Sequence, residues 1–511
     1  MTNSENNKRI AKNTLFLYFR MGITMLVQLY TSRVVLNTLG VDDYGIYNVV
    51  GGIILMFSFL SQSMTIATQR FLNVEIGKGN EEALKHTFSM SMTLHIGIAL
   101  FVVILGETIG LWFLNSKLNI PLERMEAANW VYQITIISAC ISTPIIPYNA
   151  AILAREKMSF YAYQSIATVF LKLGVVFLLT LAPFDKLIFY ALLILSVTLF
   201  ANLWVKVYCN RHFAETKYLW IWDKALFKQL LNLSSWYFMG SFIGTVTEHG
   251  LKMLQNIFYG VRINAAMGIA SNIQMMVFQF STNITVAFQP QIFQSYAKND
   301  LDTTTNLTFR AAKFSYLFMF AVIIPILLNM DFILRLWLVN VPEWTVIFSK
   351  LTLIIILASA SCWTFAQPIT ASGKIKTDIL WGNGMGIAKI LVAYILMRQG
   401  YSPETILYFP IILAFIQTTV RVVLSRRILS FSFRRLWNQV VSKILIVTAI
   451  SLPLPIAISN YASNLEALIF TTLSFAFMLA PTVYFFGLDS AEKKLAMVAI
   501  QKIKPFKKLD A

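Results

Sequence analysis

Long apolar runs recur from one end of the chain to the other. Fourteen such runs alternate with short polar segments, and each has the roughly 20 residues that a helix needs to cross a hydrocarbon core of about 30 Å. Helices are expected because every backbone group in lipid must find its hydrogen bond within the protein. The predicted spans are 13–39, 44–69, 87–114, 128–154, 160–182, 186–208, 230–259, 263–289, 308–338, 345–371, 377–397, 404–425, 438–459 and 465–487. The pattern predicts an all-α polytopic membrane protein.

The chain also contains an internal duplication. A shift of about 220 residues brings similar segments into register: Thr65-Ile66-Ala67 falls on Thr285-Val286-Ala287, Asn80 on Asp300, and Asn119-Ile120-Pro121 on Asn340-Val341-Pro342. Each repeat holds six spans, an even number, so both repeats enter the membrane from the same side and are parallel rather than inverted. We therefore predict an N-lobe at 1–215, a cytoplasmic or interfacial linker at 216–229, a C-lobe at 230–430, two extra helices at 431–488 and a basic cytoplasmic tail at 489–511.

Composition and charge agree with this architecture. A chain with 57% hydrophobic residues, 13% charged residues and a mean hydropathy of +0.65 is not an ordinary soluble protein. The net charge of +18 reports topology, because alternating assignment of the loops puts about 27 Lys and Arg inside and about five outside. Both termini are therefore expected to be cytoplasmic, with the basic segments near anionic lipid headgroups. Nucleic-acid binding is not expected.

Ionisable residues inside spans are functional candidates by default, since they are costly to bury in lipid. Two pairs recur in the duplication. Lys172 and Lys389 each follow another lysine by 15 residues on the fifth and eleventh spans, and Arg33 matches Lys252 on the first and seventh. Arg20, on the first span, has no basic counterpart. We predict that these five cations line a central cavity.

Other interpretations of these residues stay open. Arg33 and Lys252 lie close enough to the outer helix ends to extend their charges toward the interface. Glu248 precedes Lys252 by four residues, the favourable order for a helical ion pair, and is interpreted either as a structural partner or as a protonatable coupling site. With five cations against one carboxylate, the cavity is expected to attract anions, particularly phosphates.

Two motifs resemble a known family. The segment 32–48, SRVVLNTLGVDDYGIYN, and the segment 67–71, ATQRF, followed by Gly77-Lys78-Gly79, are similar to Wzx-type oligosaccharide flippases of the MOP superfamily, which includes MurJ-type lipid II flippases and MATE transporters. The resemblance implies alternating-access transport of polyprenyl-pyrophosphate-linked oligosaccharide from the inner to the outer leaflet of a bacterial cytoplasmic membrane, for cell-surface polysaccharides such as lipopolysaccharide O-antigen. It also implies that Arg20, Arg33, Lys172, Lys252 and Lys389 bind the pyrophosphate or acidic sugars.

The resemblance further implies which partners to expect. These are the lipid-linked oligosaccharide and membrane lipids, while docking of polysaccharide polymerase machinery stays open. No cofactor is expected, and coupling to protons or to sodium is left undecided. An enzyme is not expected, because the outer loops are short and no nucleophile–base constellation occurs. The alternative is a MATE-type cation-coupled multidrug antiporter, which shares the fold and would need an acidic cavity.

Overall fold

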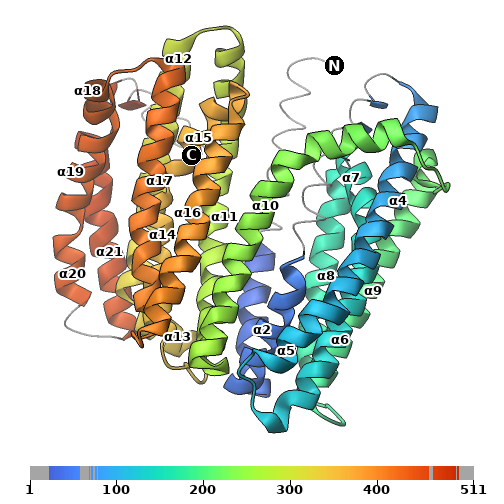
Figure 1. The fold of residues 1–511 in the computed structure, drawn as a ribbon. Helices are drawn as coiled ribbons and strands as arrows, with labels where there is room; N and C mark the ends of the chain where they lie inside the picture. The colour runs from blue at the N-terminus through green and yellow to red at the C-terminus, as the bar shows by residue number, and fades with distance from the viewer. Residues whose placement is uncertain are drawn as a thin grey trace, which may run out of the picture. The chain divides into compact units, whose positions relative to one another are not determined.

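The computed structural model describes residues 22–57, 68, 71–72, 75–76, 79–155, 157–459, 464–490 and 492–493. Within these residues the chain is helical and forms no strand (Figure 1), which confirms the all-α prediction. A helix covers residues 22–39. It is followed by α2 (Val41–Leu55), α4 (Glu81–Leu105), α5 (Leu111–Ser116), α6 (Met125–Ser142), α7 (Ile146–Ala154), α8 (Met158–Leu179), α9 (Lys186–His212), α10 (Lys224–Tyr259), α11 (Val261–Ala297), α12 (Leu301–Leu328), α13 (Met330–Trp337), α14 (Thr345–Ser359), α15 (Cys362–Ala371), α16 (Ile375–Arg398), α17 (Thr405–Leu429), α18 (Phe433–Leu436), α19 (Ser442–Ser451), α20 (Pro453–Ser459) and α21 (Leu465–Thr482).

Short irregular turns extend several of these helices. Three are π-helical: η1 (Gly106–Gly110), η5 (Trp437–Val441) and η6 (Val483–Gly487). Three are 3₁₀-helical: η2 (Leu122–Arg124), η3 (Thr143–Ile145) and η4 (Ala214–Thr216). The turn η1 has a clear cause, because Tyr132 donates its hydroxyl to the carbonyl of Gly106 at 2.7 Å and leaves no room for a side chain at Gly110.

Among the described residues, nine helices are long and apolar enough to cross a membrane: Glu81–Ser116, Leu122–Ala154, Ser159–Leu179, Lys186–His212, Leu301–Leu328, Lys376–Arg398, Thr405–Leu429, Phe433–Ser459 and Leu465–Gly487. The pair α14 and α15, bent by 42°, makes a tenth if it is one span. Of the other predicted spans, 13–39 and 44–69 fall partly outside the described residues. The helices α10 and α11 are present but carry many polar side chains. The chain is a multi-pass membrane protein, and the count of fourteen spans is not confirmed.

The duplication is visible in the backbone as well as in the sequence. Gly40 has a φ of 83° and Gly260 one of 82°, while Gly79 has 68° and Asn299 has 59°. Each pair is separated by 220 residues, the repeat offset. Positive φ is costly for residues other than Gly and, to a lesser extent, Asn, so the two repeats place their tightest turns at equivalent points.

Equivalent residues also begin equivalent helices. Asn80 accepts a hydrogen bond from the backbone N–H of Ala83 at the start of α4, and Asp300 accepts one from Thr303 at the start of α12, both at 3.0 Å. A side-chain oxygen at this position satisfies an N–H that has no partner within the helix. The match of Asn80 with Asp300 in sequence is therefore a match of helix caps.

The described residues form two compact units. The first lies within Met1–Ala270, Trp337–Thr345 and Gly382–Ile406, and the second within Ser271–Leu336, Val346–Trp381 and Leu407–Ala511. In the first unit α9 packs beside α6 and α8; in the second, α21 packs beside α19 and α20 (Figure 1). These units follow packing rather than the duplication, so the lobes 1–215 and 230–430, the linker 216–229 and the segments 431–488 and 489–511 stay predictions.

Candidate functional site

Three of the predicted site residues come together in the first unit. Glu248 and Lys252 lie one turn apart on α10, with the Lys252 Nζ 3.9 Å from the Glu248 Oε1. Lys389, on α16, interacts electrostatically with both of them. The Glu248 side chain is 64% exposed and that of Lys252 is 20% exposed. Two cations therefore face one largely exposed carboxylate, which leaves a surplus positive charge.

A small residue brings α16 close enough to α10 to build this group. A Cβ added to Gly386 would lie 2.9 Å from the Thr247 hydroxyl oxygen, so the helices touch where the glycine is. Small residues allow such close backbone approach between membrane helices. One turn further along α16, Lys389 lies beside the same stretch of α10. The position of Lys389 is thus fixed by packing, not by its own charge.

An apolar pocket of about 370 Å³ lies in the same unit. Its walls come from the end of α2, from η1 and α5, from α10 and from α16, and every lining residue is apolar. Gly250 and Ile390 line it, two residues from Lys252 and next to Lys389 in sequence. A pocket of this size and character suits part of an apolar or amphipathic ligand. The arrangement combines an apolar surface with positive charge.

The other predicted cations are placed differently. Lys172 is exposed on α8, and within the described part of the chain no ion pair reaches it. Arg33 is half-buried on the helix 22–39. Arg20 lies outside the described residues. The structure therefore groups Lys252 and Lys389 with Glu248, while a role for Arg20, Arg33 and Lys172 in the same cavity stays a prediction.

Buried polar groups near the α10–α11 turn escaped the sequence analysis. Gln255 and Asn264 are almost fully buried, and the Asn264 Nδ2 donates to the carbonyl of Lys252 at 2.8 Å. His249 is partly buried with its Nδ1 toward Gly52 of α2, 3.6 Å from an added Cβ. Buried polar groups are costly unless they find partners. The signal that could have found them is the low hydropathy of this part of a predicted span.

Asp43 and Asp185 share one arginine near the start of α6. Arg124 donates from Nε to Asp43 at 2.7 Å and from Nη1 to Asp185 at 2.5 Å. Burial raises the pKa of Asp43 above its ordinary value, even though the hydrogen bonds from Arg124 oppose it. Burial also acts to raise the pKa of Asp185, but the Arg124 side chain and the N–H groups of Ile188 and Leu187 outweigh it and hold that pKa below its ordinary value.

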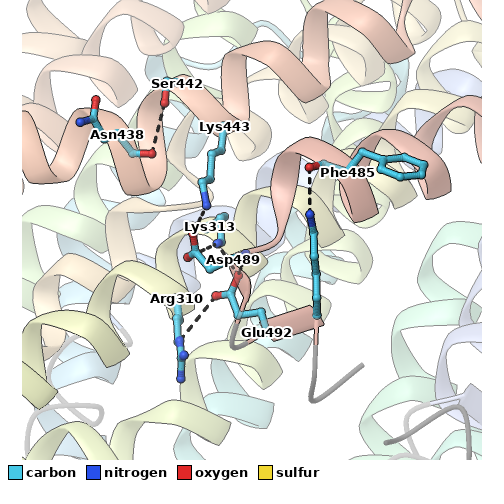
Figure 2. Close-up of polar contacts among 9 residues, drawn as sticks. Arg310, Lys313, Asn438, Ser442, Lys443, Phe485, Asp489 and Glu492 are labelled. Carbon is cyan, nitrogen blue, oxygen red and sulfur yellow. Dashed lines mark hydrogen bonds and ion pairs between the residues drawn. The ribbon is translucent and has the colours of Figure 1, made fainter. Parts of the chain in front are cut away.

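The second unit contains two further buried ion clusters. Arg421, on α17, pairs with both oxygens of Asp378 on α16, at 2.8 and 3.1 Å. Lys313, on α12, lies between Asp489 and Glu492 (Figure 2), with its Nζ 2.6 Å from the Glu492 Oε2. Neither Arg421 nor Lys313 was identified as a candidate residue in the sequence analysis. Both lie within predicted spans, where a basic residue needs a buried partner.

Comparison with known proteins gives similarity of fold alone. No protein-family model matches the sequence, and no curated protein matches it. Several solved structures match this chain in fold. The inward-facing conformation of a multidrug resistance MATE family transporter of the MOP superfamily matches with a TM-score of 0.68 at 13% identity, over 80% of this chain and 97% of that one. This chain has the MATE fold.

Two other structures show the same fold. MATE in complex with MaD3S matches with a TM-score of 0.60 at 14% identity, over 82% of this chain and 96% of that one. A MOP superfamily transporter from Pyrococcus furiosus matches with a TM-score of 0.62 at 14% identity, over the same shares. That protein is described as having a binding pocket of reverse polarity, which suggests a different function for it. Polarity of the pocket is therefore a property that varies on this fold.

Proposed function

We propose that this chain is a flippase that moves a polyprenyl-pyrophosphate-linked oligosaccharide from the inner to the outer leaflet by alternating access, for cell-surface polysaccharide synthesis. The observation that carries the proposal is the grouping of Lys252 and Lys389 with Glu248, which leaves a surplus positive charge among these three residues. An apolar pocket lined by Gly250 and Ile390 lies in the same unit. Cations bind phosphate through charge-assisted hydrogen bonds. The apolar pocket in the same unit would suit the first part of a hydrocarbon tail.

The physical problem that such a protein solves fits the fold. A glycan and pyrophosphate head cannot cross hydrocarbon alone, because its polar groups would lose their hydrogen bonds. A cavity that opens to one side and then the other shields the head while the tail stays in lipid. An inside-negative potential favours outward movement of an anion by about 2.3 kcal/mol per charge per 100 mV. A proton or sodium gradient would then be needed mainly to reset the empty carrier.

The proposal includes a location and partners. The strong excess of Lys and Arg on alternate loops supports a bacterial cytoplasmic membrane protein with both termini on the cytoplasmic side. The lipid-linked oligosaccharide is the proposed substrate and the surrounding lipids are contacts. A polysaccharide polymerase is the partner we propose on the outer side, where the flipped unit is consumed.

The test measures the lipid-linked sugar pool on each leaflet after depletion of the protein. Inner-leaflet accumulation with a fall in surface polysaccharide is expected. When the depleted cells express the variant Lys252→Gln or Lys389→Gln, the flipping rate should be roughly ten- to hundred-fold lower than with the natural chain. This is the effect of losing one charge-assisted hydrogen bond. Lys374→Gln is the matched control, because Lys374 is exposed and lies just before α16. If neither the size of the lipid-linked sugar pool nor its distribution between the two leaflets changes, the proposed flippase function is disproved.

The second candidate function is cation-coupled drug efflux. The MATE transporters among the fold neighbours and the exposed carboxylate of Glu248 favour it. In the same depleted cells, efflux of a lipophilic cation such as ethidium would fall, and the lipid-linked sugar pool would not change. The two outcomes separate the two functions in one strain.

A further inference from the structure

A polar pocket of about 490 Å³ lies in the second unit, at the beginning of α12. Thr303, Arg310 and Lys313 line it from α12, Gln439 lines it from η5, and Asp489 lines it from the segment after η6. Figure 2 shows the charged lining residues Arg310, Lys313 and Asp489 together with their neighbours Lys443, on α19, and Glu492. This pocket takes no part in the site proposed for transport.

The charges of this pocket do not cancel. Asp489 accepts hydrogen bonds from Lys443 and from Lys313, and Glu492 accepts one from Lys313 (Figure 2). The Arg310 Nε forms an ion pair with the Glu492 Oε1 at 3.5 Å (Figure 2), a distance beyond the usual range of an N–H···O hydrogen bond. The two lysines therefore neutralise the two carboxylates, and Arg310 remains as a surplus positive charge.

Arg310 keeps N–H donors for a further anion beyond its ion pair with Glu492. Its side chain is 34% exposed, and within the described residues its guanidinium group makes no hydrogen bond. A guanidinium carries five N–H donors in a planar fork that matches phosphate oxygens. Thr303 and Gln439 add a hydroxyl and an amide to the same pocket, so a phosphate would find one charged and two neutral donors.

The surroundings of the pocket point to a lipid as the source of the phosphate. Large apolar side chains are exposed on α18, η5 and η6, among them Phe433, Trp437 and Phe485. Aromatic residues of this kind concentrate where a membrane protein meets the headgroup region. The predicted topology places this end of α12 on the cytoplasmic side, where basic pockets between helices bind anionic headgroups.

We propose that this pocket binds the phosphate of an anionic membrane phospholipid, with Arg310 as its charged donor and the acyl chains along the exposed apolar surface. The site is separate from the transport site and does not depend on the proposed function. Its ligand is recognised by the phosphate charge, so a zwitterionic headgroup should bind more weakly. The bound lipid would stabilise the contact of the C-terminal segment with α12.

The experiment uses the purified full chain and measures both lipid binding and the thermal unfolding midpoint. Mixed micelles containing phosphatidylglycerol are compared with micelles containing phosphatidylcholine. Phosphatidylglycerol is expected to raise the midpoint, and Arg310→Gln should weaken its apparent affinity about ten- to hundred-fold. Gln439→Leu, which removes only a neutral donor, should weaken it less. Arg335→Gln is the control, since Arg335 is exposed and pairs with Asp331.

Each contrary outcome is specific. Equal loss with Arg310→Gln and Arg335→Gln would show general attraction of charge and overturn the site. Equal stabilisation by phosphatidylcholine would overturn recognition of an anionic lipid. Full competition by inorganic phosphate would show that a soluble anion, not a lipid, is the occupant. If Arg310→Gln fails to fold, Gln439→Leu decides the question, because unchanged affinity in that variant removes the pocket as the binding site.

Discussion

Asp42 and Arg262 stand at equivalent positions of the two repeats, 220 residues apart, and they form an ion pair with each other. The Arg262 Nε donates to the Asp42 Oδ1 at 3.0 Å. Beside this pair, the backbone N–H of Asn119 donates to the Asn256 side chain at 2.7 Å. The first and second repeats are thus joined at one end of the first unit, which the predicted topology places on the outer side.

Reversing one charge of this pair should loosen that end. Arg262 is 78% exposed and Asp42 46%, so little folding stability is at stake. Asp42→Arg places two cations together and should increase labelling of Ile120→Cys, a buried neighbour, by a membrane-impermeant thiol reagent. The swap Asp42→Arg with Arg262→Asp should return labelling to the original level. Labelling that stays high in the swap would show that the pair does not hold this end closed.

Gly45 and Gly51 lie on the same helix and should respond oppositely to the same substitution. A Cβ at Gly45 would lie 2.1 Å from the carbonyl oxygen of Val261, whereas one at Gly51 meets nothing within 4 Å. Gly45→Ala should lower stability by about 3 kcal/mol through overpacking, and Gly51→Ala should raise it by about 0.5 kcal/mol. Thermal unfolding in detergent measures both, and equal midpoints would contradict the close helix contact.

The sequence predicts the positions of the helices well, but it predicts poorly which residues of different helices contact each other. Each of the nine membrane-spanning helices found among the described residues coincides with a predicted span, because lipid imposes one period and one minimum length on a spanning helix. Asn80 and Asp300 align with each other in the sequence, but only the backbone structure shows that each of them caps a helix. Hydropathy does not predict Gly45 as a contact point, because the close approach depends on Val261, more than 200 residues away in the chain.

The charged clusters of the structure could be found from the sequence only in part, for a physical reason. Comparison of the two repeats identifies only basic residues that have a basic counterpart in the other repeat. Lys252 and Lys389 were identified in this way. Lys313 has no basic counterpart, since the same offset puts it on Thr93. Its partners Asp489 and Glu492 lie beyond the repeats. A charge stabilised by a segment outside the duplication cannot be found by symmetry.

Arg124→Gln should destabilise the protein in a pH-dependent way. The pKa of Asp185 is held below its ordinary value, so its contribution is present above that value and is lost as pH falls through the lowered pKa. The pKa of Asp43 is raised by burial, so its contribution has the opposite sign and is lost as pH rises through the raised pKa. At pH 7, loss of Arg124 removes the hydrogen-bonded partner of both carboxylates and should cost about 2 kcal/mol.

The measurement compares the unfolding midpoint of Arg124→Gln with that of the natural chain, at pH 7 and near pH 3. Carboxylates begin to take up protons near pH 3, because that pH is close to their ordinary pKa. The deficit should shrink at the lower pH. Lys186→Gln is the control, because Lys186 is exposed beside Asp185 and makes no ion pair within the described residues. A deficit of equal size at both values would show that Arg124 acts by packing and not by charge.

Glu248→Gln separates an anion carrier from a cation carrier. The carboxylate is 64% exposed and 3.9 Å from Lys252, so the pair itself is worth at most about 1 kcal/mol. In a flippase for an anionic head, removing this carboxylate should leave flipping within about five-fold of the original rate. In a cation antiporter it should abolish efflux. Leaflet-resolved assay of the lipid-linked sugar gives the answer, and complete loss of flipping would assign Glu248 a coupling role.

Lys313→Met tests the buried cluster of the second unit. Lys313 is 1% exposed and Glu492 is 3% exposed, so removing the lysine leaves a buried carboxylate without its main partner. Such a loss costs about 3–5 kcal/mol. Lys493→Met is the matched control, because Lys493 is half-buried, donates to the carbonyl of Phe485 and lies over the Tyr484 ring, with no ion pair to a carboxylate within the described residues. Adding Glu492→Gln to Lys313→Met should recover part of the loss in unfolding midpoint. Equal midpoints for Lys313→Met and Lys493→Met would mean that the C-terminal segment does not depend on this cluster.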